Sequence, residues 1–257
     1  MAPPIPKSGP DMAVTVEAPA APGPFVLVCE HASNAFPAPW GDLGLSAAQR
    51  QAHIAWDPGA LGLARALARR LEAPLVAANQ SRLIYDLNRP PHSPGAMAAR
   101  SEVHDIPGNA ALGPTERLTR TEAIYLPFHA RVQAELARRL AQGQRPVMVT
   151  VHSFTPVFNG QPRAVELGII HDAAPALAQA VLAESLTQTH LAARLNEPYS
   201  AADEVTHTLA LHATPMGLLN VMLEIRNDLI ATPEAEEGMA ELLAPVLRAA
   251  RARLEAA

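Results

Sequence analysis

The run Phe25-Val26-Leu27-Val28-Cys29 decides the fold class of this chain. A short, uninterrupted apolar run is typical of a strand that is buried on both faces of a parallel sheet. Similar short runs of strand-forming residues follow further along the chain. They predict strands at residues 75–78, 82–87, 147–151, 165–170 and 219–225, with a possible short strand at residues 14–16.

Helix-length segments separate these strands. Asp57-Pro58 is typical of an N-cap followed by proline at the first helical position, and it opens a predicted helix that reaches Leu71. Further helices are predicted at residues 117–141, with a bend at Pro127, and at residues 175–187 and 234–255. Strands that alternate with helices predict an α/β sandwich around a mostly parallel sheet.

The chain is predicted to consist of a tail and one domain. Residues 1–24 contain seven prolines, which remove backbone hydrogen-bond donors and fix φ too often for regular structure. We therefore expect a Pro-rich N-terminal tail at residues 1–24 and a single domain at residues 25–257. Residues 89–114 are rich in Pro, Gly and Ala, and we expect an ordered loop or a lid there, because strong patterns resume on both sides.

Composition excludes several functions. The 257 residues carry a formal charge of −5, and no cluster of Lys and Arg offsets it locally, so no nucleic-acid partner is expected. No apolar run reaches the roughly 18 residues of a membrane span, and the N-terminus has no basic segment followed by an apolar one. The single cysteine cannot form an internal disulfide. We expect a cytoplasmic protein without a membrane partner.

Polar residues follow the predicted strands, where parallel α/β sheets collect their ligands. His31 and His152 each come directly after an apolar strand, and Asp57 precedes a helix that should pack on the same sheet. Two imidazoles and one carboxylate are a ligand set of catalytic zinc. Taken singly, each histidine also fits a capping or core role, and Asp57 fits a helix cap. Glu30 is a weaker ligand candidate, because adjacent strand residues point to opposite faces.

Glu224 ends a predicted apolar strand, where a carboxylate is unexpected unless it is paired or used. It is a candidate general base, and the alternative is an ion pair with Arg226, two residues along on the same face. Arg82, Arg89 and Arg226 are candidates for binding a carboxylate through the planar guanidinium. The chain has no G-x-S-x-G elbow and no glycine-rich phosphate loop.

Six stretches in order along the chain resemble the N-formylglutamate amidohydrolase family. They are residues 28–34, 55–60, 81–89, 151–154, 196–200 and 224–230. The resemblance implies a three-layer α/β/α sandwich with a mixed, mostly parallel sheet, similar to the zinc-dependent exopeptidases. Glu30-His31-Ala32-Ser33 stands where many members have Pro-His-Ser-Gly, which indicates a divergent branch.

The resemblance also implies a function and a site. The expected reaction is metal-dependent hydrolysis of the amide of an N-formyl or other small N-acyl amino acid, an anionic substrate. By similarity, His31, Asp57 and His152 would hold a divalent metal, Zn²⁺ being favoured, and Glu224 would be the base. The residues expected to bind substrate are Arg82, Asn88, Arg89 and Arg226.

Two alternatives remain open from the sequence. One is a catalytically silent ligand-binding relative in which Glu224 and Arg226 form a structural pair. The other is an amidase that uses Cys29 as its nucleophile. Fe(II), Mn(II) and Ni(II) also suit two histidines and a carboxylate, and the sequence assigns no role to His129 or His212.

Overall fold

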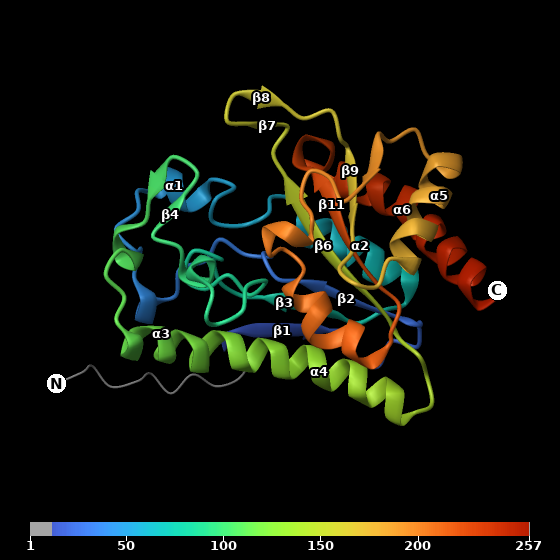
Figure 1. The fold of residues 1–257 in the computed structure, drawn as a ribbon, viewed down its shortest axis with the longest axis horizontal. Helices are drawn as coiled ribbons and strands as arrows, with labels where there is room; N and C mark the ends of the chain where they lie inside the picture. Colours follow the sequence, from blue (N-terminus) through green and yellow to red (C-terminus); the bar gives the residue numbers. More distant parts are fainter. Residues whose placement is uncertain (1–11, 257) are drawn as a thin grey trace.

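A seven-stranded mixed sheet forms the centre of the protein in the computed structural model, which describes residues 12–256 (Figure 1). Its strands lie in the order β1-β3-β2-β6-β11-β9-β10. They are β1 (Val14–Glu17), β2 (Phe25–Cys29), β3 (Leu75–Ala78), β6 (Val147–Phe154), β9 (Leu167–Ile170), β10 (Ala193–Leu195) and β11 (Asn220–Arg226). The central strands β3, β2, β6 and β11 are parallel, whereas β1 is antiparallel to β3 and β9 is antiparallel to β11. The edge strand β10 is parallel to β9.

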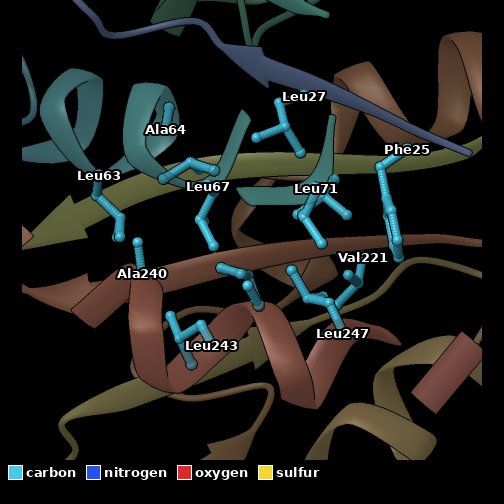
Figure 2. Packing of buried hydrophobic residues seen from close by; sticks show 14 of the residues in the cluster. Phe25, Leu27, Leu63, Ala64, Leu67, Leu71, Val221, Ala240, Leu243 and Leu247 are labelled. Carbon is cyan, nitrogen blue, oxygen red and sulfur yellow. The ribbon is translucent and has the colours of Figure 1, made fainter. Parts of the chain in front are cut away.

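The central strands are apolar because helices cover both faces of the sheet. Every residue of β2 and of β6 is buried. One face carries α2 (Ala60–Leu71), α5 (Ala176–Gln188) and α6 (Pro233–Glu255), and α4 (Leu126–Ala141) lies against the other (Figure 1). Figure 2 shows leucines of α2 and α6 packed against each other beside the sheet. The predicted three-layer α/β/α sandwich with a mixed, mostly parallel sheet is therefore confirmed.

The predicted strand at residues 82–87 is wrong, because this segment forms turns. Polar side chains there bond the backbone locally and compete with strand pairing. The backbone N–H of Leu83 donates to Ser81 Oγ, and the backbone N–H of Asn88 donates to Asp86 Oδ1. These contacts fold the segment back toward the ends of β2 and β6, where it contributes to a cavity.

The predicted single helix at residues 117–141 is interrupted. It consists of α3 (Pro114–Arg120), a π-helical turn at Thr121–Tyr125, and α4. Pro127 lacks a backbone N–H and leaves the preceding turn without its normal donor. The N–H of Leu126 instead reaches the carbonyl of Thr121, which widens the turn to the π form.

Short elements lie at the edges of the fold. β1 falls within the segment predicted as a tail, so residues 14–17 belong to the sheet, while residues 1–11 lie outside the described part of the chain. Within residues 89–114, β4 (Arg100–Ser101) pairs with β5 (His104–Asp105). Other short elements include α1 (Ala47–Gln51), β7 (Val157–Phe158) and β8 (Gln161–Pro162). Within residues 12–256, no helix is long and apolar enough to cross a membrane.

Candidate functional site

A cavity of about 660 Å³ opens where β2, β6 and β11 end. Most of the residues that were predicted for the site line it. These are His31, Asp57, Arg82, Asn88, Arg89, His152 and Glu224. Arg226 is not among the lining residues. The cavity therefore gathers side chains from three parallel strands and from the turns at residues 82–89.

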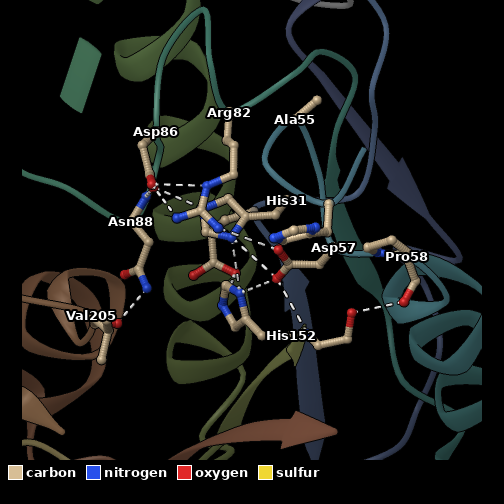
Figure 3. Close-up of polar contacts among 12 residues, drawn as sticks. His31, Ala55, Asp57, Pro58, Arg82, Asp86, Asn88, His152 and Val205 are labelled. Carbon is tan, nitrogen blue, oxygen red and sulfur yellow. Dashed lines mark hydrogen bonds and ion pairs between the residues drawn. The ribbon is translucent and has the colours of Figure 1, made fainter. Parts of the chain in front are cut away.

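Three atoms that could bind a metal lie close together in this cavity. His152 Nδ1 lies 2.9 Å from Asp57 Oδ2 and 3.1 Å from His31 Nδ1, and His31 Nδ1 lies 3.2 Å from the same Asp57 oxygen. Figure 3 shows the three side chains pointing toward one another. Ligand atoms around a tetrahedral zinc, at bonds of about 2.0–2.1 Å, lie about 3.3–3.4 Å apart. The spacing of His31, Asp57 and His152 therefore fits a metal site.

The far nitrogen of each histidine faces a carboxylate. His31 Nε2 lies 2.8 Å from Asp86 Oδ1, and His152 Nε2 lies 3.2 Å from Glu30 Oε2. A carboxylate in this position orients the ring of a metal-binding histidine and raises the basicity of its ligand nitrogen. Both imidazoles are thus arranged to present Nδ1 to a shared cation.

The charge of the cluster also fits a divalent cation. Glu30, Asp57 and Asp86 are buried, and the guanidinium of Arg82 contacts Asp57 at 3.4 Å and Asp86 at 2.6 Å. Three carboxylates against one guanidinium leave a formal excess of two negative charges when the imidazoles are neutral. Burial raises the pKa of the Asp86 carboxyl, but Arg82 and then His31 hold that pKa well below its usual range. Buried charge of this size requires compensation.

Asp57 does not act as the helix cap that its sequence position suggests. The N-cap of α2 is Gly59, in the left-handed region with φ of 79°, and the helix begins at Ala60. A Cβ at position 59 would lie 2.3 Å from the carbonyl of Ile230, so a glycine is required there. The Asp57 side chain is released from capping and turns toward the histidines.

Glu224 lies on β11 beside His152 on β6, in register with it. It is 5 % exposed and lines the cavity, and within the described part of the chain its Oε2 has no hydrogen-bond partner. Burial raises its pKa to about 7. The expected alternative, a pair with Arg226, is not formed: the ion pairs of Arg226 in the structure are with Glu166 and Asp228.

Asn88 and Arg89 join the turns at residues 82–89 to residues 204–208. Asn88 Nδ2 donates to the carbonyl of Val205, and Asn88 Oδ1 accepts from the N–H of Thr208 at 3.1 Å. Arg89 Nη1 donates to the carbonyls of Asn88 and Glu204, at 2.9 and 2.8 Å. Both side chains line the cavity while they hold its wall together.

Sequence reasoning missed three residues of this region and gave too little weight to a fourth, Glu30. Asp86 and Glu30 contact the metal-ligand candidates, and Arg163 and Tyr199 line the cavity. A sequence signal existed for Asp86, because it is a carboxylate at the end of the segment predicted as a strand, where ligand-binding side chains collect. Arg163 lies in an irregular segment after β8, where the pattern gives no orientation.

Cys29 is unsuited to nucleophilic catalysis. Its thiol is fully buried, and Cys29 is not among the residues that line the cavity. Burial, followed by the charge of Glu30, raises its pKa well above the ordinary thiol value. The thiolate is the nucleophilic form, so Cys29 is inert in this environment.

The fold and this cavity define a class of protein: an α/β sandwich with a buried candidate metal centre and an adjacent carboxylate at the ends of its parallel strands. Residues 23–231 match the family model of N-formylglutamate amidohydrolase. The match spans most of the chain, and the chain belongs to the N-formylglutamate amidohydrolase family.

Two solved structures are similar over nearly the whole chain. The crystal structure of the gene product Atu2144 from Agrobacterium tumefaciens is 52 % identical, with a TM-score of 0.92, and the alignment covers 95 % of this chain and 96 % of that one. The N-formylglutamate amidohydrolase from Ralstonia eutropha JMP134 is 18 % identical with a TM-score of 0.66, over 96 % of this chain and 100 % of that one, and it shares the fold. None of the curated proteins compared with the chain matches it.

Proposed function

We propose that this chain is a metal-dependent amidohydrolase that cleaves the amide of an N-formyl or other small N-acyl amino acid, such as N-formyl-L-glutamate. The observation that carries the proposal is the convergence of His31 Nδ1, His152 Nδ1 and Asp57 Oδ2 in one cavity. Membership of the amidohydrolase family supports the reaction class. The products would be a carboxylate, formate in the first case, and the free amino acid.

We propose that His31, Asp57 and His152 hold a divalent metal, and that this metal is Zn²⁺. Two imidazoles and a carboxylate suit zinc and leave a position for other ligands. When bound, the cation would supply Lewis-acid polarisation of the acyl carbonyl. The carboxylates of Asp86 and Glu30 support this assignment, because they stand where they would orient both rings.

Glu224 is the proposed general base. It would take a proton from the attacking water and pass it to the leaving nitrogen. Its pKa of about 7, raised by burial, lies near neutral pH, where one carboxylate can both accept and return a proton. Its position beside His152 on the neighbouring strand supports a role at the scissile bond.

The remaining site residues are proposed to bind substrate. Arg82 is already paired with two carboxylates, so its role would be to stabilise negative charge on the acyl oxygen beside the metal ligands. Arg89 would bind the α-carboxylate, because its partners in the structure are uncharged carbonyls. Asn88 would hold residues 82–89 against residues 204–208 at the cavity wall and donate its remaining amide hydrogen to the substrate.

Formate release from N-formyl-L-glutamate tests this function. We expect the full-length protein to lose activity on chelation and to regain it when Zn²⁺ is restored. We expect His31→Ala to lose stoichiometric metal in elemental analysis, which ties the metal to this site. Full activity in a protein shown to be metal-free would overturn the mechanism.

A further inference from the structure

Arg163 enters the cavity from the segment between β8 and β9. Its guanidinium lines the same cavity as Glu224 and Tyr199. Neither the strand-end pattern nor the metal-ligand cluster includes it. Its surroundings nevertheless show features of a binding residue: a fixed position, N–H donors that remain available and, among the described residues, no carboxylate at ion-pair distance.

Aromatic rings fix the position of this guanidinium. Its central carbon lies 4.5 Å from the ring centre of Phe158, 5.1 Å from that of Tyr199 and 5.4 Å from that of Phe154. Ring contacts occupy the flat faces of a guanidinium and leave the N–H edges available. Arg163 donates at 3.3 Å to the carbonyl of Thr155 and at 3.2 Å to the hydroxyl of Tyr199. An arginine has five N–H donors, so others remain for a ligand.

In the part of the chain that the structure describes, Arg163 forms no ion pair with a carboxylate. Arg82 is paired with Asp57 and Asp86. In residues 12–256, by contrast, neither Arg163 nor Arg89 has a carboxylate within ion-pair distance, and the hydrogen bonds of both go to uncharged oxygens. The cavity thus presents two guanidiniums whose charge an anionic ligand would balance.

A hydrogen bond from the side chain of Arg226 holds the backbone of Arg163. Arg226 Nη1 donates to the carbonyl of Arg163 at 3.2 Å, and the ion pairs of Arg226 with Glu166 and Asp228 hold that donor in place. Arg226 therefore has a structural role, and it does not line the cavity. A binding side chain that is already ordered in the free protein loses less conformational entropy when the ligand binds.

We propose that Arg163 is a specificity-determining residue that binds a second carboxylate, the one on the side chain of an acidic amino-acid substrate. The proposal rests on the proposed function and assigns a residue of this chain to the second carboxylate of a substrate such as N-formyl-L-glutamate. Arg89 would bind the α-carboxylate, and the rings of Phe154 and Phe158 would contact the methylenes of the side chain. A substrate with one carboxylate would leave one guanidinium without an anion.

The test compares N-formyl-L-glutamate with N-formyl-L-glutamine, which has the same size and lacks the second charge. On the metal-loaded, full-length protein, we expect Arg163→Gln to lower kcat/KM for the glutamate substrate about 10- to 100-fold, the range of a charge-assisted hydrogen bond. The value for the glutamine substrate should change less than about threefold, and Arg163→Lys should lie in between for glutamate. Arg145→Gln, an equal charge change far from the cavity, is the matched control.

Binding separates this proposal from the proposed function. In a Glu224→Gln background, titration calorimetry gives Kd for both formyl compounds without turnover, and adding Arg163→Gln should weaken the glutamate compound selectively. An equal loss for both compounds, or no loss for either, would overturn the role of Arg163. Selective binding in a wild-type protein that hydrolyses neither compound would overturn the amidohydrolase function and leave the role of Arg163 standing.

Discussion

Acid should destabilise this protein through one buried histidine pair. His129 and His212 are 5 % and 3 % exposed, and His129 Nδ1 lies 2.8 Å from His212 Nε2. His129 Nε2 donates to the carbonyl of Leu87, and in the neutral pair its Nδ1 accepts the hydrogen bond from His212 Nε2. Burial, followed by the charge of neighbouring histidines, lowers the pKa of His129 to about 3 and that of His212 to about 4.

The sign and size of the effect follow from these values. A histidine in the unfolded chain has a pKa of about 6.5. Below that pH the unfolded state gains protons that the folded state does not, so stability present above pH 6.5 is lost as pH falls toward 4. Below pH 6.5, each histidine lowers the free energy of unfolding by about 1.4 kcal/mol per pH unit. By pH 5 the loss is about 2 kcal/mol for each histidine and about 4 kcal/mol for the pair. His207 adds to the effect, whereas the negative charge of Glu30 opposes it.

Urea unfolding at pH 7.5 and pH 5.0 measures this loss. Other groups also titrate, so the loss in the free energy of unfolding between the two pH values is compared in two proteins. The informative quantity is the loss in the wild type minus the loss in the double variant His129→Gln/His212→Gln. We expect that difference to be about 4 kcal/mol. His212→Gln alone should show about half of it, which protects the test if the double variant folds poorly. Equal losses in wild type and variants would refute the reasoning.

The site gives three further predictions. Glu224→Gln should lower kcat by about 10²- to 10⁴-fold with unchanged metal content, measured by formate release and elemental analysis, and unchanged kcat would exclude a general base. Glu30→Gln should weaken metal binding about 10- to 100-fold in a competition with a chromophoric chelator, whereas an unaltered affinity would show that Glu30 does not support His152. Cys29→Ala should retain turnover within about twofold, because the thiol is buried away from the cavity, and loss of turnover in a folded variant would point to thiol chemistry.

The fold could be predicted where burial is uniform. β2 and β6 are buried on both faces, so their apolar runs carry a clear signal, and the helices between them follow from the spacing. The segment at residues 82–87 misled because Ile84 and Leu87 are buried in turns rather than in a strand. Apolar content shows that a segment is buried and does not show which backbone conformation buries it.

The site was partly predictable for a related reason. Strand ends identified His31, His152 and Glu224, because parallel strands bring their carboxyl ends to one edge. Glu30 was undervalued because alternation was applied to it as if the strand continued. β2 ends at Cys29, so the side chains of Glu30 and His31 escape the alternation and both reach the histidine cluster. The orientation of residues beyond a strand end depends on tertiary contacts that no local pattern contains.

Charge connects the proposed metal site to the proposed binding of an anionic substrate. The net charge of −5 describes the whole chain, but the cavity separates charge, with buried carboxylates around His31 and His152 on one side. On the other side, the guanidiniums of Arg89 and Arg163 have no carboxylate partner among the residues that the structure describes. Without a cation, and despite burial, Glu30 and Asp57 raise the pKa of His152 well above its ordinary value, so a protonated His152 offsets part of the negative charge. The remaining excess would repel the proposed anionic substrate. Metal removal should therefore raise the Kd of N-formyl-L-glutamate as well as stop hydrolysis, and the increase should shrink at high salt, because screening weakens the repulsion.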